Sequence, residues 1–100
     1  MAVRIIEIAP KVSPMPEDSI LAHLTIENFK WVNEQSQQQG VSSRAAMFDW
    51  IVNKHGKAYI KKGDNTIFVF GANIPSGQYI RALVDEKWTD DLLELPEISK

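Results

Sequence analysis

The side chains suited to metal binding are few in this chain, and they do not form a recognisable site. A metal site needs two or three histidine or carboxylate ligands at a fixed spacing. The two histidines, His23 and His55, are separated by a loop and by much of the chain. His55 instead fits the C-terminus of a helix, where its charged form interacts favourably with the helix dipole. We therefore expect no histidine metal site.

A second cluster of chemically active groups lies near the C-terminus, where Asp85, Glu86, Asp90 and Asp91 follow one another closely. Their oxygens could surround a divalent cation, but the cluster lacks the spacing and the glycine of a calcium loop. In the favoured alternative, Thr89 or Asp90 caps a short helical turn and the other carboxylates are solvated. We expect no bound metal here.

The sequence contains no pattern typical of covalent or acid–base catalysis. The chain has no cysteine, which excludes a thiol nucleophile and a disulfide framework. Its serines do not occur in a strand–turn–helix elbow with flanking glycines, and the stretch from Gly71 to Gly77 lacks the lysine of a phosphate loop. Paired carboxylates such as Asp85 and Asp90 occur in any acidic sequence. Neither catalysis nor a cofactor is indicated.

Aromatic and basic side chains alternate with aliphatic ones along three predicted strands, and they form the main candidate surface. One strand face is aliphatic, and the opposite face carries Tyr59, Phe68, Phe70, Tyr79, Arg81 and Leu83 beside Lys57 and Lys61. Aromatic rings between basic residues are typical of sheets that stack the bases of single-stranded nucleic acid. The candidate binding residues are Tyr59, Lys61, Phe68, Tyr79, Arg81 and Trp88.

Two alternatives to nucleic-acid binding remain open for this aromatic face. In the favoured one, the C-terminal Trp88, Leu92, Leu93 and Leu95 cover it and complete a second small core, because large bare apolar patches are uncommon on soluble monomers. Truncating Trp88 to alanine would then cost several kcal/mol. In the second, the face is buried against another copy of the chain in a homodimer. The formal net charge of −2 makes unspecific binding to a phosphate backbone a weaker candidate.

The charges are distributed unevenly along the chain. A basic group contains Lys54, Lys57, Lys61, Lys62 and His55, and an acidic group contains Asp85, Glu86, Asp90, Asp91, Glu94 and Glu97. The two groups could face each other within one molecule, between two molecules, or toward different partners.

The elements that must position these residues follow from residue type and periodicity. Residues 2–8 and 20–33 are rich in β-branched and aromatic residues and predict two antiparallel strands, although the pattern at 20–33 also allows a helix. Further strands are predicted at 57–62, 66–70 and 79–84. Residues 10–19 and 34–41 predict loops. Ser42 or Ser43 should cap a helix from Arg44 to His55 that stops at Gly56. Turn residues at 63–65 predict a hairpin.

This order predicts an α+β fold: a two-layer, mostly antiparallel five-stranded sheet (β-β-α-β-β-β) packed on one long helix, with a short C-terminal helical turn. One hundred residues predict a single domain spanning 1–100. No apolar run approaches the length of a signal or membrane-spanning segment, so a cytoplasmic protein is expected.

The C-terminal motif resembles a small bacterial family of domains of unknown function. The residues that carry the resemblance are Tyr79-Ile-Arg, Asp85 and Trp88-Thr-Asp-Asp-Leu-Leu-Glu-Leu-Pro, with weaker matches at Trp31, Met47–Ile51 and Ala58–Lys61, so that it covers roughly Leu24 to Pro96. The family pattern has glycine in place of Glu86 and asparagine in place of Asp91. Because glutamate resists positive φ, the turn at Glu86 is expected to be of a different type.

The resemblance implies a shared fold and brings no activity, substrate or cofactor. Together with the residue patterns, it favours a small, intracellular, non-catalytic binding or protein-interaction module. The alternative is a single-stranded nucleic-acid-binding domain that uses Tyr59, Phe68, Tyr79 and Arg81.

Overall fold

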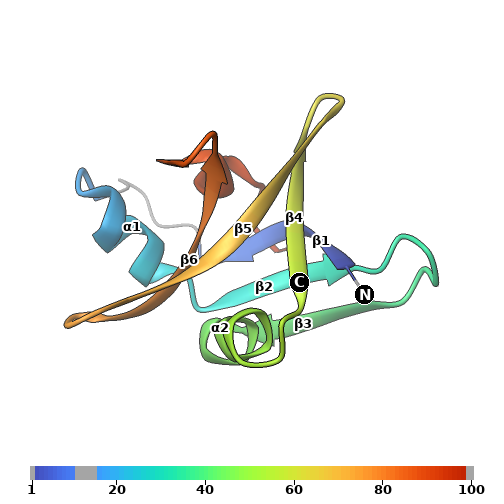
Figure 1. The fold of residues 1–100 in the computed structure, drawn as a ribbon, viewed down its shortest axis with the longest axis horizontal. Helices are drawn as coiled ribbons and strands as arrows, with labels where there is room; N and C mark the ends of the chain where they lie inside the picture. The colour runs from blue at the N-terminus through green and yellow to red at the C-terminus, as the bar shows by residue number, and fades with distance from the viewer. Residues whose placement is uncertain (1, 11–15, 99–100) are drawn as a thin grey trace.

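The computed structural model describes residues 2–10 and 16–98. The described residues form, in chain order, β1 (Ala2–Ala9), α1 (Ser19–Thr25), β2 (Asn28–Val32), β3 (Gln39–Ser43), α2 (Arg44–Val52), β4 (Lys57–Lys62), β5 (Asn65–Ile74), β6 (Gly77–Val84), β7 (Lys87–Thr89) and the 3₁₀-helix η1 (Asp91–Glu94). The strands form one sheet in the order β3-β2-β1-β4-β5-β6-β7 (Figure 1).

Within this sheet only the β1–β4 pair is parallel, and the other neighbouring strands are antiparallel. The predicted α+β class with a mostly antiparallel sheet is therefore confirmed. The prediction of five strands and one helix is wrong, because the described residues contain seven strands and two α-helices.

The first error lies in residues 20–33, which were predicted as one strand. The Asp18 side chain accepts hydrogen bonds from the backbone N–H groups of Ile20 and Leu21, which caps the short helix α1. The helix ends at Thr25, and the β-branched and aromatic residues that suggested a strand form one only in β2, from Asn28 to Val32. The predicted loop at 10–19 lies partly outside the described residues, and its last residue, Ser19, begins α1.

The second error lies in the predicted loop at 34–41, whose end belongs to strand β3. This strand has no apolar run and depends on pairing with β2 across a turn at Asn33. The Asn33 side chain accepts from the backbone N–H groups of Gln35 and Ser36, while its own N–H donates to the Gln38 carbonyl at 2.7 Å. Tertiary pairing therefore creates β3 where the local pattern is polar.

The second half of the chain follows the prediction closely. The Ser43 hydroxyl accepts from the Ala46 N–H at 3.1 Å and caps α2, as expected, although the helix ends at Val52 rather than at His55. Strand β4 has the predicted bounds, and Gly63, with φ of 62°, makes the predicted β4–β5 turn. Strand β5 extends to Ile74, beyond the predicted Phe70.

Helix α2 covers one side of the sheet, which we call the inner face, and the main core lies there. Its buried side chains come from all parts of the fold: Val3, Ile5, Ile8, Ile26, Phe29, Met47, Phe48, Ala58, Ile60, Ile67, Val69, Ile80, Ala82 and Leu92. Helix α1 packs beside the start of β6, away from α2 (Figure 1).

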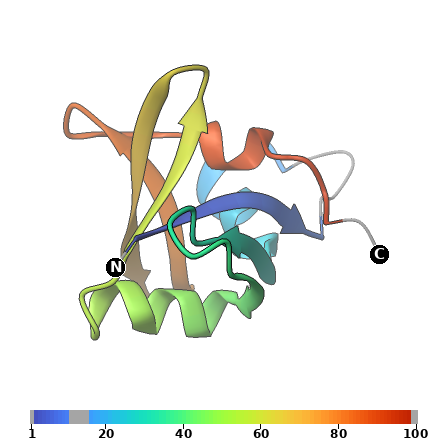
Figure 2. The same cartoon turned by 90° about the vertical axis from the view of Figure 1, so that its right-hand side faces the viewer.

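The C-terminal segment returns to the first strand and completes the core. The Ile8 N–H donates to the Pro96 carbonyl at 3.0 Å, and the Ile98 N–H donates to the Ile8 carbonyl at 2.9 Å. Figure 2 shows this segment, with η1, passing along β1. No helix in the described part of the chain is long and apolar enough to cross a bilayer.

The β6–β7 turn has an unusual backbone for its residues. Asp85 and Glu86 have φ of 51° and 68°, and Val84 pairs with Lys87 on either side of them. Two positive φ values in a two-residue hairpin loop are typical of a type I′ turn, which favours Asn-Gly or Asp-Gly. Glu86 itself therefore adopts the left-handed conformation that glutamate was expected to resist.

Replacing Glu86 by glycine should raise the free energy of unfolding by about 1 kcal/mol, because glycine has no steric penalty at positive φ. Urea denaturation checks this expectation. As a control, Lys87→Gly at the first residue of β7 should lower stability, since glycine loses more backbone entropy than other residues when it is fixed in a strand. An unchanged or reduced midpoint for Glu86→Gly would contradict the turn assignment.

Candidate functional site

The side of the sheet opposite to α2, which we call the outer face, carries a row of large apolar side chains. Tyr59 pairs with Phe68 across β4 and β5, with ring centroids 6.1 Å apart in an edge-on arrangement, and Leu83 pairs with Trp88 across β6 and β7. Phe70 follows Phe68 on the same side of β5. We call these five residues the aromatic face.

The aromatic face is open to solvent at its centre. Phe68, Phe70 and Trp88 are 43%, 45% and 43% exposed, whereas Ile67 and Val69, which alternate with the phenylalanines, are buried in the main core. The strict alternation along β5 therefore fixes the inner side chains by packing and holds the outer rings on a rigid support.

The favoured prediction that the C-terminal segment covers this face is wrong. Leu92 is completely buried in the main core, and Leu93 and Leu95 pack against that core. Trp88 belongs to β7, so its pairing with Leu83 places it on the open side of the sheet. The segment thus extends the aromatic face instead of covering it.

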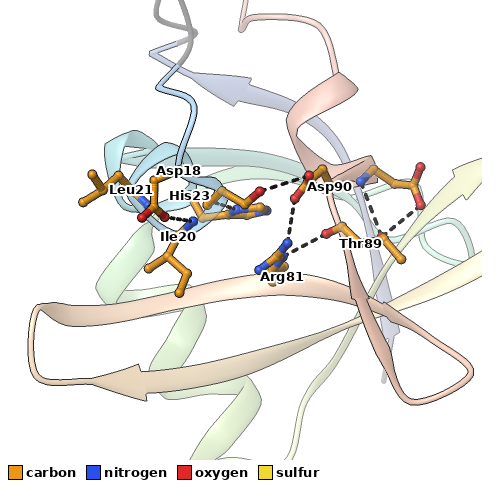
Figure 3. Close-up of polar contacts among 9 residues, drawn as sticks. Asp18, Ile20, Leu21, His23, Arg81, Thr89 and Asp90 are labelled. Atoms are coloured by element: carbon orange, nitrogen blue, oxygen red, sulfur yellow. Dashed lines mark hydrogen bonds and ion pairs between the residues drawn. The ribbon is translucent and has the colours of Figure 1, made fainter.

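Two of the predicted binding residues, Tyr79 and Arg81, are not available at the open surface. Tyr79 is only 4% exposed, and its ring lies 6.0 Å from that of His23 on α1. Arg81 donates from Nε to the Thr89 carbonyl at 3.0 Å and from Nη2 to Asp90 at 2.8 Å (Figure 3). Neither side chain is free to stack on or bind a nucleic acid in this arrangement.

The other predicted residues, Tyr59, Lys61, Phe68 and Trp88, share the outer face. Phe70 was recognised as part of this face but was not chosen as a binding residue, although its two-residue spacing from Phe68 carries the same signal. The alternation pattern could thus have identified it.

The β4 margin of the aromatic face has a basic excess, because Arg4, Lys57 and Lys61 accompany one carboxylate, that of Glu34. The Tyr59 hydroxyl donates to the Glu34 carboxylate, which also lies 4.0 Å from Arg4. This hydrogen bond from Tyr59 is the main cause that lowers the pKa of Glu34, and it raises the pKa of Tyr59. Lys57 and Lys61 are exposed and form no ion pair with the described residues.

The β4–β5 turn end is tied to η1 by a further ion pair. Lys62 lies 2.9 Å from Asp91 and 3.9 Å from Glu94. The hydrogen bond between Lys62 and Asp91 raises the pKa of the lysine and lowers the pKa of the carboxyl group. Asp91 therefore has a structural partner, as does Asp90 through Arg81, whereas Asp85 and Glu86 of the predicted cluster lie in the exposed turn.

A second polar cluster lies beneath α1 (Figure 3). His23 is 1% exposed, its Nδ1 lies 2.6 Å from the Ser19 carbonyl, and its Nε2 is buried without a hydrogen-bond partner in the described chain. Burial is the main cause that lowers the pKa of His23. The Ser19 hydroxyl donates to Asp90 at 3.2 Å.

These contacts do not form a nucleophilic relay. In such a relay the serine hydroxyl donates to the imidazole, whose other nitrogen donates to a carboxylate. Here the hydroxyl of Ser19 donates directly to Asp90, and His23 contacts only the serine's backbone oxygen. The cluster is suited to docking α1 on β6.

A cavity of about 300 Å³, open to solvent beside the exposed Gln38 and Ala46, lies between α2 and the β1–β2–β3 part of the sheet. Its walls are formed by Val3, Trp31, Asn33, Gln38, Ser42, Ala46, Met47 and Trp50, none of which is charged. The Trp31 indole N–H donates to the Ser42 hydroxyl at 3.0 Å, so the indole does not need a hydrogen-bond acceptor in the cavity. We interpret the space as incomplete packing around two tryptophans.

Filling this cavity should stabilise the domain. Ala46→Leu adds apolar volume to the cavity wall and should raise the free energy of unfolding by about 1 kcal/mol. Ala45→Leu, on the same exposed turn of α2 but outside the cavity, is the matched control and should change stability little. Equal effects of the two substitutions in thermal or urea denaturation would contradict this interpretation.

No group of three or more His, Cys, Asp or Glu side chains within the described ranges is arranged to hold a metal ion. Comparison of the chain with family models, with curated proteins and with solved structures finds no match. The resemblance to a bacterial domain family therefore stays a prediction.

Proposed function

We propose that this domain is a non-catalytic protein-interaction module that binds its partner through the aromatic face. The main support for this proposal is that Phe68, Phe70 and Trp88 are each more than two-fifths exposed on one side of one sheet. Aromatic residues are enriched at the centres of protein interfaces, and contiguous exposed apolar patches often mark interaction sites.

The sheet supports this role because it holds the rings before a partner arrives. Phe68 is flanked by the buried Ile67 and Val69, so the backbone of β5 is held in place by the core. An aromatic side chain has few rotatable bonds, and little conformational entropy is lost when a rigid strand presents it. Polar and charged residues at the margins, including Lys61 and Asp85, would form the solvated rim that interfaces have.

A single-stranded nucleic acid is the second candidate partner. Tyr59, Phe68 and Phe70 lie beside Lys57 and Lys61, which is the combination that stacks bases and contacts phosphates. Two observations favour a protein partner instead: the net charge is −2, and Arg81 already binds Asp90.

Site-specific photo-crosslinking tests the proposed surface. A p-benzoylphenylalanine residue replaces Phe68, or Val41 as a control, and cells that express the chain are irradiated. Val41 is a suitable control because it is also apolar and exposed but lies on β3, away from the aromatic face. We expect a protein adduct from position 68 that is absent from position 41.

The adduct should disappear when Phe70→Ser and Trp88→Ser are added, provided that circular dichroism shows an intact fold. A nuclease-sensitive adduct at position 68 would support the second candidate, and no adduct there would contradict both. An independent test measures tryptophan fluorescence with short oligonucleotides at low and high salt. Salt-dependent quenching would favour nucleic acid over protein.

A further inference from the structure

We propose that the partner on the aromatic face is a second copy of this chain, related to the first by a two-fold axis that runs along the strands. The inference rests on the proposed function, since it names the occupant of the same surface. The apolar residues of the aromatic face and the charged residues around it are arranged so that the surface can pair with itself.

The two margins of the aromatic face carry opposite charges. The β4 margin is net basic: it presents Lys57 and Lys61, which are exposed and form no salt bridge with the described residues, and the Glu34 carboxylate bonded to Tyr59 lies near Lys61. The opposite margin ends in the exposed Asp85–Glu86 turn between β6 and β7, which is likewise outside the ion pairs of the described chain. The aromatic side chains lie between these margins.

Lys61 and the acidic turn lie at the same end of the strands. Lys61 pairs with Thr66 near the start of β5. Strand β6 runs antiparallel to β5, so its last residue, Val84, lies toward the same end, and the Asp85–Glu86 turn follows it. Phe68, Leu83 and Asp85 line one shallow depression there, which confirms that these residues are neighbours.

A two-fold axis along the strands places the β4 margin of one copy opposite the β6–β7 margin of the other. The same strand ends of the two copies then lie next to each other. This axis places Lys61 opposite the partner's Glu86 and, by symmetry, Glu86 opposite the partner's Lys61. The same rotation sets Tyr59 and Phe68 against the Trp88 and Leu83 side of the partner subunit. One patch therefore complements itself, with apolar side chains against apolar side chains and opposite charges facing each other, as an isologous interface requires.

This pattern favours a second copy over an unrelated partner. A surface for an acidic or a basic partner needs a rim of one sign, whereas this rim is net basic on one side, where Glu34 accompanies Lys57 and Lys61, and acidic on the other side of a central apolar row. Two twisted sheets also pack face to face with their strands nearly aligned, which suits an axis along the strands. Because the exposed apolar area is small, we expect a weak dimer, with a dissociation constant of about 10 µM or more.

Sedimentation equilibrium of the full chain over a wide concentration range tests the inference. The wild type should show reversible dimerisation, and Phe68→Ser should abolish it. Lys61→Glu should weaken the dimer about tenfold, because two symmetry-related attractions become repulsions. Glu86→Lys should have a similar effect, and the combined Lys61→Glu/Glu86→Lys chain should regain most of the wild-type affinity.

Lys54→Glu is the matched control, because it makes the same charge change at an exposed residue just beyond α2 whose ion-pair partner, Asp49, lies in the same chain. Its dimer should be unaffected. A charge swap that fails to restore the dimer, or a control that weakens it equally, would overturn the two-fold arrangement.

The inference and the proposed function fail in different ways. A chain that stays monomeric at every concentration, while position 68 crosslinks to a different protein, overturns the second copy and leaves the interaction surface standing. A monomer that also gives no adduct at position 68 overturns both. A crosslinked product of twice the 11.3 kDa chain mass supports both.

Discussion

Replacing Leu92 by alanine should lower the free energy of unfolding by about 3 kcal/mol, because the substitution leaves a cavity in the main core. Leu92 is completely buried in this core, to which β1, β4 and β6 also contribute, and it is the fully buried anchor of the C-terminal segment. Urea denaturation monitored by circular dichroism measures the change.

Trp88→Ala is the informative comparison for Leu92→Ala. The sequence alone assigns the larger loss to Trp88, since truncating a core aromatic costs several kcal/mol. In the structure Trp88 is 43% exposed on β7, so its truncation should cost about 1 kcal/mol. If Trp88→Ala destabilised the domain as much as Leu92→Ala, the aromatic face would have to be covered in solution.

The stability of the domain should fall below pH 6.5 because of His23. Burial lowers the pKa of His23 in the folded state, so the unfolded chain binds the proton more readily. The contribution of the neutral imidazole is complete above the unfolded pKa of about 6.5 and is lost as the pH falls toward the lower folded value. Within that window, the free energy of unfolding should decrease by up to about 1.4 kcal/mol per pH unit.

The groups that face His23 shift its pKa in opposite directions. The hydrogen bond to the Ser19 carbonyl and the charge of Asp90 raise the pKa of His23, while burial, the largest cause, and the charge of Arg81 lower it. The buried Nε2 has no acceptor within the described chain for a second proton. Protonation should therefore loosen α1 from β6, starting at the contact of His23 with Tyr79.

Denaturation at a series of pH values with His23→Gln checks this expectation. The variant should lose the pH dependence that begins below about pH 6.5, because that dependence comes from the lowered pKa of the buried histidine. His55→Gln is the matched control, because His55 is exposed after α2 and its loss should leave the dependence in place. A wild-type slope that persists in His23→Gln would assign it to other groups.

The expected effects of Leu92→Ala and of His23 protonation both depend on the segments that cover the sheet. Leu92 enters the main core on the inner face, and His23 docks α1 over Tyr79 at one end of β6. Between these two attachments Phe68, Phe70 and Trp88 remain exposed. The open surface that we propose as a binding face is thus the part of the sheet that neither α1 nor the C-terminal segment reaches.

Features with local signals could be predicted from the residues themselves. Alternation between Lys57 and Lys62 and along β5 and β6 predicted the strands and their inner faces, because side chains of an extended chain point to opposite sides in turn. Ser43 predicted the start of α2, because a hydroxyl at that position satisfies a free helical N–H. The Asp18 cap of α1 carries the same kind of signal, but the β-branched residues after it hid the helix.

Which side chains cover which face depends on contacts between distant segments, and the sequence pattern does not report them. Strand β3 exists because β2 offers it a hydrogen-bonding edge, and its polar residues carry no pattern of their own. Tyr79 and Phe68 occupy the same side of the sheet, yet α1 buries the first and leaves the second open. Burial of Leu92 rather than Trp88 likewise depends on strands far away in the chain, because periodicity indicates a residue's side of a strand without indicating what packs against it.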